Sequence, residues 1–258
     1  MLRGLYTAYT GMLNEQYRMD IMSNNLANAD TTGFKKEGST SQAYADVMAV
    51  KIKDVSENPN TPKRLGNMSL GVKIGETFTD FSQGSLRDTG NTYDIAIGGD
   101  GFFNIEFTSK SGVTSTKYTR DGGFTVTKDG YLVTKDGDYV LGENGRIQLS
   151  TTEGSTVFDD SGNIYQDDRL VASLKLTKFE DTNYLTHYGE TMWDVKEGAV
   201  SSDADDAKIY QGYLEMSNAS VVKEMVNMIT ISRHYESNQK MLTTFDETLE
   251  KSMTLSKV

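Results

Sequence analysis

The chain has 258 residues, of which 36 % are hydrophobic and 24 % charged, a composition typical of a soluble globular protein rather than a disordered one. Its 37 acidic residues outnumber its 26 basic residues, which argues against binding to nucleic acid or to an acidic membrane surface. Cysteine is absent, which excludes disulfides, cysteine-ligated zinc, iron–sulfur clusters and thiol nucleophiles. We find no apolar run of about 18 residues and no apolar signal segment after Met1, so we expect neither membrane insertion nor a cleaved Sec signal.

Apolar side chains recur every seven residues near the start of the chain. The row that defines this repeat consists of Leu5, Met12, Met19 and Leu26. A second row is only partly apolar, with Leu2 and Tyr9 followed by Gln16 and Ser23. Because such a repeat is typical of a helix with one packed face, it predicts an amphipathic helix over roughly residues 3–29.

The segment that follows is less regular. Residues 44–52 fit either a short helix or a strand. Residues 56–67 carry both prolines of the chain, which favours a loop or an extended connector.

The middle of the chain has the pattern of β structure. Apolar and polar residues alternate over residues 93–97, 103–107 and 170–176, which predicts strands. Turn sequences rich in Asp and Gly occur at 98–101, 121–123, 129–130, 136–137 and 161–163. Residues 127–140 contain a seven-residue near-repeat, which predicts two successive hairpins.

A second seven-residue repeat lies near the other end of the chain. Its first row is unbroken and consists of Val221, Met228, Tyr235, Leu242 and Leu249. Four residues further on, a second row contains Met225 and Met253 but is diluted by Ser232, Gln239 and Asp246. The repeat predicts a long helix over roughly residues 218–254.

Neither helix can shield its own apolar stripe. Both lead to the same central region from opposite ends of the chain, so we expect an antiparallel pair. The pair could be a helical hairpin that caps a sheet, or it could pack against other molecules. Polar residues within the stripes favour the second use, because such residues commonly set register or partner choice.

Catalytic signatures are not apparent. The sequence contains none of the phosphate-binding, metalloprotease or hydrolase motifs, and we expect no enzyme activity, no cofactor and no metal site. We interpret His187 as an exposed or hydrogen-bonded loop residue, His234 as a helix-surface residue and Trp193 as a core or sheet-edge aromatic. The acidic groups at 159–160, 167–168, 203 and 205–206 lack calcium-loop spacing, so we interpret them as solvated turns.

The end of the first predicted helix carries an unusual cluster of asparagines. Asn24, Asn25 and Asn28 lie within five positions, although asparagine amides compete with the helix backbone for hydrogen bonds. The amides could instead serve a packed contact. Gly33 is placed to end the helix with a positive φ.

This segment resembles a signature of bacterial flagellar axial proteins, specifically the basal-body rod proteins. In that family Ser/Ala-Asn-Asn-Leu-Ala-Asn is followed closely by Thr-x-Gly-Phe/Tyr-Lys/Arg, as from Ser23 to Lys35. Residues 212–238 resemble the family's C-terminal helix pattern. Further similar stretches are 83–86, 94–97, 101–103 and 118–122. The match at 212–238 favours a distal rod protein, with the proximal rod protein as second choice.

The resemblance implies an α+β fold with a discontinuous, coiled-coil-like antiparallel helical inner domain and a mainly antiparallel β outer domain. We expect an N-terminal inner helix within 1–35 and an extended or partly helical connector over 36–75. The β-rich outer domain would span 76–211, and the C-terminal inner helix would lie within 212–258.

The resemblance also implies a structural function. The subunit would polymerise into the hollow drive shaft that links the membrane motor to the hook, and so contribute to motility. Its partners would be itself, other rod and hook proteins and the flagellar type III export apparatus, with no nucleic acid and no small-molecule substrate. It would reside in the basal body after export without a cleaved signal peptide. The alternative is a secreted β-domain module, carbohydrate-binding or adhesin-like, with helical termini.

We therefore predict an assembly interface on the two helices, with Gly33 as terminator of the first. The predicted interface residues are Leu5, Tyr9, Met12, Met19, Asn24, Asn25, Leu26, Asn28, Val221, Met225, Met228, Tyr235, Leu242 and Leu249.

Overall fold

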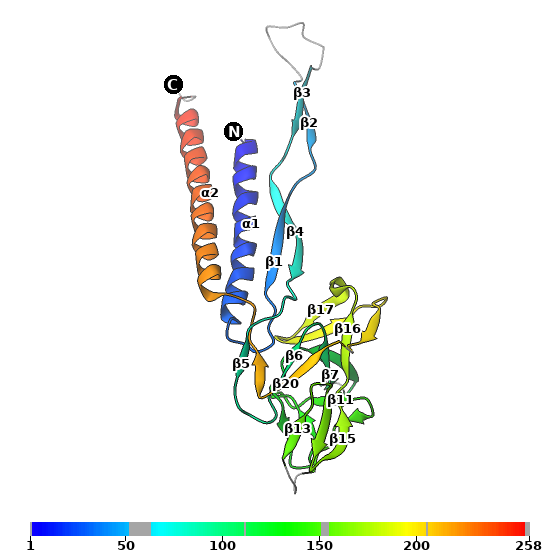
Figure 1. The fold of residues 1–258 in the computed structure, drawn as a ribbon. Helices are drawn as coiled ribbons and strands as arrows, with labels where there is room; N and C mark the ends of the chain where they lie inside the picture. Colours follow the sequence, from blue (N-terminus) through cyan, green and yellow to red (C-terminus); the bar gives the residue numbers. More distant parts are fainter. Residues whose placement is uncertain (1, 52–62, 111, 151–154, 205, 256–258) are drawn as a thin grey trace. The chain divides into compact units, whose positions relative to one another are not determined.

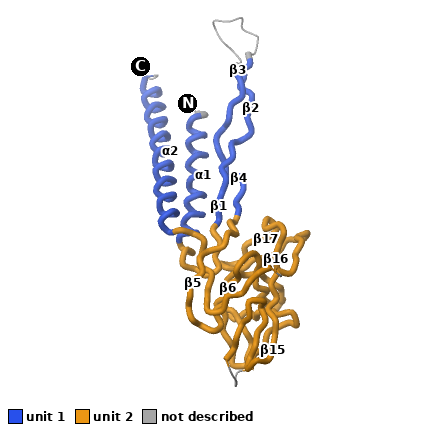
Figure 2. The backbone as a smooth tube through the Cα atoms, viewed as in Figure 1, with its two compact units in different colours: residues 1–26, 37–78, 221–258 blue, residues 27–36, 79–220 orange. Residues whose placement is uncertain are grey.

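A computed structural model describes the chain except residues 1, 52–62, 111, 151–154, 205 and 256–258 (Figure 1). The chain forms two compact units (Figure 2). Residues 1–26, 37–78 and 221–258 make up the first, which we call the helical unit, and residues 27–36 and 79–220 make up the second, the β unit. Both are discontinuous, because the chain passes between them four times.

Two long helices lie side by side in the helical unit (Figure 1). Helix α1 spans Leu2–Ala27 and helix α2 spans Val221–Leu255. Gly4 faces Phe245 and Gly11 faces Asn238, so rising numbers in one helix meet falling numbers in the other. The antiparallel helix pair predicted from the seven-residue repeats is confirmed, with ends that differ by at most three residues from the prediction.

The rest of the helical unit consists of two-stranded ribbons. Strand β1 (Glu37–Ala43) pairs with β4 (Val72–Thr79), and β2 (Val47–Lys51) pairs with β3 (Lys63–Met68). Asn14 of α1 donates a 3.0 Å hydrogen bond from Nδ2 to Ser41 Oγ in β1. Of residues 44–52, for which helix and strand were both open, Val47–Lys51 form strand β2, residues 44–46 lie in no helix or strand, and residue 52 lies outside the described part. Of the expected connector over 56–67, residues 63–67 lie in β3, and residues 56–62 lie outside the described part.

A large antiparallel sheet dominates the β unit. Its main path runs β17–β18–β8–β7–β11–β10–β9, and β16 adds to β7, β19 to β16 and β12 to β11. The strand bounds are Phe102–Thr108 (β7), Thr114–Thr119 (β8), Thr125–Val126 (β9), Leu132–Val133 (β10), Tyr139–Gly142 (β11), Gly145–Arg146 (β12), Leu176–Phe179 (β16), Leu185–Tyr188 (β17), Met192–Val195 (β18) and Ser201–Asp203 (β19). A 3₁₀ turn, Thr182–Tyr184, precedes β17.

Smaller sheets complete this unit. Strands β13 (Thr156–Phe158), β14 (Asn163–Gln166) and β15 (Arg169–Ser173) form one sheet, β6 (Ile95–Gly98) pairs with β20 (Lys208–Gln211), and β5 (Leu86–Asp88) pairs with β21 (Tyr213–Glu215). The main core contains fully buried Ile95, Phe103, Leu132 and Ile164. A second core contains Phe102, Phe179, Leu185 and Trp193. With two terminal helices and this antiparallel body, the α+β fold class is confirmed.

The tandem repeat forms two successive hairpins, as predicted. Strands β9, β10 and β11 are connected by turns in which Gly130 and Gly137 have φ of 85° and 93°. The two turns contain the same hydrogen bond: Tyr131 N and Asp138 N each donate to a threonine hydroxyl four residues earlier. The repeated sequence therefore produces a repeated turn.

One predicted strand was wrong in extent. Residues 170–176 belong to two strands, β15 and β16, in different sheets. At the change of sheet, Leu174 N donates to Gly162 O and Lys175 N donates to Leu141 O. Ala172, Leu174 and Leu176 are buried or half-buried, so the apolar alternation continues across this point although the partner strand changes.

Candidate assembly site

The two helices pack through a narrow line of contact, which we call the helix seam. On α1 the seam is made by residues without large side chains: a Cβ added to Gly4 would lie 2.6 Å from the Phe245 ring, and one added to Gly11 would lie 2.9 Å from Asn238 Nδ2. Small residues on one helix therefore receive large ones from the other, which allows close approach of the helices.

The second row of the α2 repeat was predicted incorrectly. In the first row Met228, Tyr235, Leu242 and Leu249 are half-buried, whereas Val221 is exposed. The row that accompanies it, however, lies three residues after rather than four residues after, and consists of Glu224, Ile231, Asn238 and Phe245. Both offsets are neighbours on a helix surface, and the polar members of the true row concealed it from a hydrophobic pattern.

A second face of α2 is apolar and exposed, and we call it the α2 outer face. It consists of Val222, Met225, Val226 and Ile229, whose side chains are 72 %, 46 %, 57 % and 54 % exposed. Their spacing of three, four and seven residues places them on one side of the helix. Four adjacent apolar side chains in water are unusual unless a partner covers them.

Helix α1 also has an exposed face. Tyr6, Tyr9 and Tyr17 are 62 %, 49 % and 58 % exposed. Tyrosine combines a large apolar ring with a polar tip, and is therefore enriched at protein interfaces.

The predicted interface residues fall into three groups. Tyr9, Asn24, Val221 and Met225 are exposed. Leu5, Met12, Met19, Leu26 and Asn28 are half-buried, as are the four α2 residues of the first row. Asn25 is buried, with 1 % of its surface exposed.

Asn25 has its partner within the chain. Its Nδ2 donates to Glu37 O at 2.8 Å, and its Oδ1 accepts from Glu37 N at 2.9 Å. One amide thus satisfies both backbone groups of the first residue of β1. The low helix propensity of Asn25 is offset by these two bonds, which connect the end of α1 to the ribbon.

Gly33 has the expected positive φ, at 70°. Helix α1, however, already ends at Ala27, so a turn separates the helix from this glycine. The glycine serves a close approach instead, because a Cβ at this position would lie 2.3 Å from Asp121 N. Next to it, Thr32 Oγ1 donates a 2.8 Å hydrogen bond to Asp121 Oδ1.

Lys35 and Glu215 form a fully buried ion pair in the β unit, which we call, together with Arg120, the buried charge cluster. Lys35 Nζ lies 2.5 Å from Glu215 Oε1, and both side chains have no exposed surface. Arg120 Nη1 lies 3.3 Å from Glu215 Oε2, and Gly84 N donates to Glu215 Oε1 at 2.9 Å. Burial lowers the pKa of the Lys35 ammonium, and the Glu215 carboxylate opposes this shift.

The cluster joins three stretches that lie far apart in the sequence. Lys35 follows α1, Arg120 follows β8 and Glu215 ends β21. The backbone contributes too, because Gly33 N donates to Glu215 O at 2.8 Å. The motif after the first helix is thereby fixed within the β unit. All three charged residues lie in stretches that resemble the rod proteins, but the sequence did not indicate that they pair. Ion pairs between residues 95 and 180 positions apart leave no local pattern.

The ring of Phe34 is connected to the second core through the ring of His187. Its ring lies 6.4 Å from the His187 ring, and His187 lies 4.7 Å from Trp193, both edge-on. His187 is therefore a residue of β17 packed against aromatic rings, which corrects its interpretation as a loop residue. Trp193 is 1 % exposed, as expected of a core aromatic. His234 is exposed on α2, as predicted.

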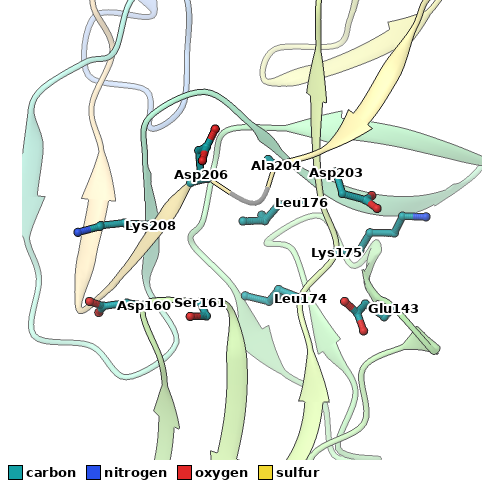
Figure 3. A pocket seen from close by; sticks show the side chains of 11 residues that line it. Glu143, Asp160, Ser161, Leu174, Lys175, Leu176, Asp203, Ala204, Asp206 and Lys208 are labelled. Carbon is teal, nitrogen blue, oxygen red and sulfur yellow. The ribbon is translucent and has the colours of Figure 1, made fainter.

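A cavity of about 680 Å³ in the β unit collects several of the acidic turn residues (Figure 3). Asp160, Asp203 and Asp206 line it, together with Lys175 and Lys208. All five side chains are exposed. Asp160 and Asp206 lie in turns, as expected, whereas Asp203 is the last residue of β19, and residue 205 lies outside the described part. Among the described residues, no group of three or more His, Cys, Asp or Glu is placed to hold a metal ion.

No helix in the described ranges is both long enough and apolar enough to span a bilayer.

Comparison with known proteins gives matches along the chain. The family model described as flagella basal body rod protein matches residues 5–35, the flagellar hook protein FlgE/F/G D1 domain matches 96–166, and the flagellar basal body rod FlgEFG protein C-terminal matches 210–255. The flagellar basal-body rod protein FlgG of Bacillus subtilis (strain 168) is 32 % identical, with 100 % of both chains covered. The FlgG of Borreliella burgdorferi is 33 % identical over 96 % of this chain and 97 % of the relative. The FlgF of Caulobacter vibrioides is 32 % identical over 98 % of this chain and 96 % of the relative.

Two terminal helices that flank an antiparallel β body, with family matches in all three parts, define a protein of the flagellar axial class. The relatives that match along nearly their whole length specify the family within this class. The chain belongs to the flagellar basal-body rod protein family, and it is a structural subunit of the rod.

Proposed function

We propose that the subunit polymerises through its two terminal helices to build the hollow drive shaft between motor and hook. The α2 outer face carries this proposal. Its four exposed apolar side chains lie on a helix whose opposite side is already occupied by α1. Covering these side chains in a neighbouring molecule would remove apolar surface from water, at about 25 cal/mol per Å² buried.

The contact would be heterologous, because α1 and α2 present different faces. Repetition of a heterologous contact with a rotation that does not close generates a helical filament. A filament of this kind supplies the rigidity that a rotating shaft needs.

The predicted interface residues divide their work in this proposal. The exposed residues, such as Met225 and Tyr9, would contact neighbouring molecules directly. The half-buried residues of the two helices, such as Leu5 and Met228, would hold the pair in register, and Asn25 would anchor the end of α1. In domain terms, 1–35 and 212–258 would contribute the inner axial domain, 36–75 the connector and 76–211 the outer domain.

Family membership supports a location in the flagellar basal body and interaction with other axial proteins. We further propose delivery by the flagellar type III export apparatus, which a chain without cysteine would pass in any redox environment. The distal rod is the proposed position, although both FlgG and FlgF relatives match at similar identity. A mechanical subunit requires no catalysis, and we propose that the chain is not an enzyme.

Electron cryomicroscopy of intact basal bodies tests this function. A small tag would be inserted at the exposed turn 136–137 in the source bacterium. We expect tag density at regular intervals around the rod. Tagged chain in the medium, with none in purified basal bodies, would instead support the secreted β-domain alternative and overturn the proposal.

A further inference from the structure

The side chain of Asn218 joins three separate stretches of the β unit. Its Oδ1 accepts a 2.8 Å hydrogen bond from Lys36 N. Its Nδ2 donates to Asp80 O at 2.7 Å and lies 3.2 Å from Ser82 O and 3.1 Å from Ser82 Oγ. An asparagine amide suits this position because it offers an acceptor and two donors in one plane.

These stretches border three of the four passages of the chain between its units. Lys36 is the last residue before β1, Asp80 follows β4 directly, and Asn218 lies three residues before α2. One amide thus fixes the points at which the chain leaves for the ribbon, returns from it and leaves again for α2.

A second set of contacts reinforces two of these passages. Asp80 N donates to Lys36 O at 3.0 Å, and Lys36 Nζ lies 3.2 Å from Asp80 Oδ2. The Ser82 N–H holds the pKa of the Asp80 carboxyl below its usual range, with Lys36 acting in the same direction. Asn218 is the member of this group that adds the α2 passage.

The fold of the β unit has other supports at the same place. Glu215 is held by Lys35, Arg120 and Gly84, and Met216 N donates to Ser85 O at 2.9 Å. Loss of the Asn218 side chain would therefore leave the β unit folded but would free the chain from Ser217 to Ser220, immediately before α2.

From this geometry we infer that Asn218 is a positioning residue for assembly, which sets the start of α2 relative to the ribbon strands β1 and β4. This inference rests on the proposed assembly function. A helix whose start is free would meet its neighbour with variable geometry, and the ordering cost would fall on the assembly step.

The test compares Asn218→Ala, Asn218→Asp and the parent chain. Asn183→Ala is the matched control. Within the described part of the chain, the Asn183 side chain donates only to Asp181, and both residues lie in an exposed turn. The absence of native cysteine allows spin labels at Lys73→Cys in β4 and Glu236→Cys in α2, both exposed. Double electron–electron resonance then gives the distance distribution between α2 and β4, Trp193 fluorescence gives the urea midpoint, and basal bodies from a strain lacking the native gene give incorporation.

We expect Asn218→Ala to keep the urea midpoint of the parent, to broaden the distance distribution at least twofold and to reduce incorporation at least tenfold. Asn218→Asp keeps the acceptor for Lys36 N but places a carboxylate oxygen against the carbonyl oxygens of Asp80 and Ser82, so a loss at least as large as that of Asn218→Ala is expected. Parent-like distances and incorporation in either variant would overturn the inference, and so would a β unit that unfolds, which would make Asn218 a folding residue. Failure of the parent chain to incorporate would overturn the proposed function instead.

Discussion

At the scale of single residues, the buried charge cluster shows how a short motif can be fixed far from its place in the sequence. Lys35 and Arg120 are both cations, and Glu215 is the carboxylate that pairs with both of them. Removing two cations from water is costly, and their positions are tolerated only while the carboxylate remains. The identity of residue 215 therefore controls whether the segment after α1 stays in the β unit.

Glu215→Gln should strongly destabilise the β unit. The substitution preserves shape but leaves Lys35 and Arg120 without a buried counter-charge, at an expected cost of about 3–5 kcal/mol. Urea unfolding monitored by the single tryptophan, Trp193, measures the change. Glu106→Gln is the control, since its partner Arg146 is 44 % exposed, and it should cost less than about 1 kcal/mol. Equal effects of the two substitutions would contradict the role of the cluster.

Gly33→Ala should also destabilise the β unit, for a steric reason. The positive φ alone costs an alanine about 1–2 kcal/mol, and the added Cβ would lie 2.3 Å from Asp121 N, so backbone must move. Gly137→Ala separates the two effects, because φ is also positive there but no atom lies within 4 Å. The same fluorescence assay should give a clearly larger loss for Gly33→Ala. A loss no larger than that of Gly137→Ala would show that space at Gly33 is not limiting.

At the scale of elements, the helices and the repeated hairpins followed from local pattern, whereas their partners did not. A seven-residue repeat or an Asp-Gly turn specifies the conformation of the residues that carry it. The true seam was hidden because Gly4 and Gly11 have no side chain to count, and because Asn238 and Glu224 are polar. Strand partners depend on long-range hydrogen bonds, so the division of residues 170–176 between two sheets had no local signal.

The candidate assembly site, like the fold, could be predicted only in part: its helices were predicted, but the contacts of their residues were not. Apolar periodicity found both helices and included Met225, which is exposed. It did not separate the seam from the outer face, because both faces of the helix carry apolar side chains and only packing distinguishes them. The asparagine cluster was recognised as unusual, but the partner of Asn25 lies in a strand whose position no repeat indicated.

Asn25→Ala tests the connection between α1 and β1. Alanine raises helix propensity, yet it leaves both backbone groups of Glu37 without their partner, so we expect a net loss of about 1–3 kcal/mol. Far-ultraviolet circular dichroism in urea and hydrogen exchange of the α1 amides measure the loss. Gln16→Ala on the exposed side of α1 should change stability by less than about 0.5 kcal/mol. A stabilised Asn25→Ala chain would mean that the two bonds contribute nothing.

At the scale of the whole molecule, the account separates two tasks. The β unit has two buried cores and a charge cluster of its own, and it includes the segments that precede and follow the long helices. The helical unit has few fully buried residues and several large exposed apolar ones. A folded β unit combined with incompletely covered helices suits a subunit that completes its packing only in a polymer.

The most direct test of this account is the incorporation of an Ile229→Asp chain into isolated basal bodies. Ile229 is 54 % exposed on the α2 outer face, so the substitution leaves the helix seam unchanged but places a charge where a neighbour should pack. We predict that Ile229→Asp keeps the Trp193 unfolding midpoint of the parent and loses incorporation at least tenfold, whereas Gln239→Asp, beyond the outer face on the same helix, incorporates normally. Normal incorporation of Ile229→Asp would contradict the central claim that this face binds the next subunit.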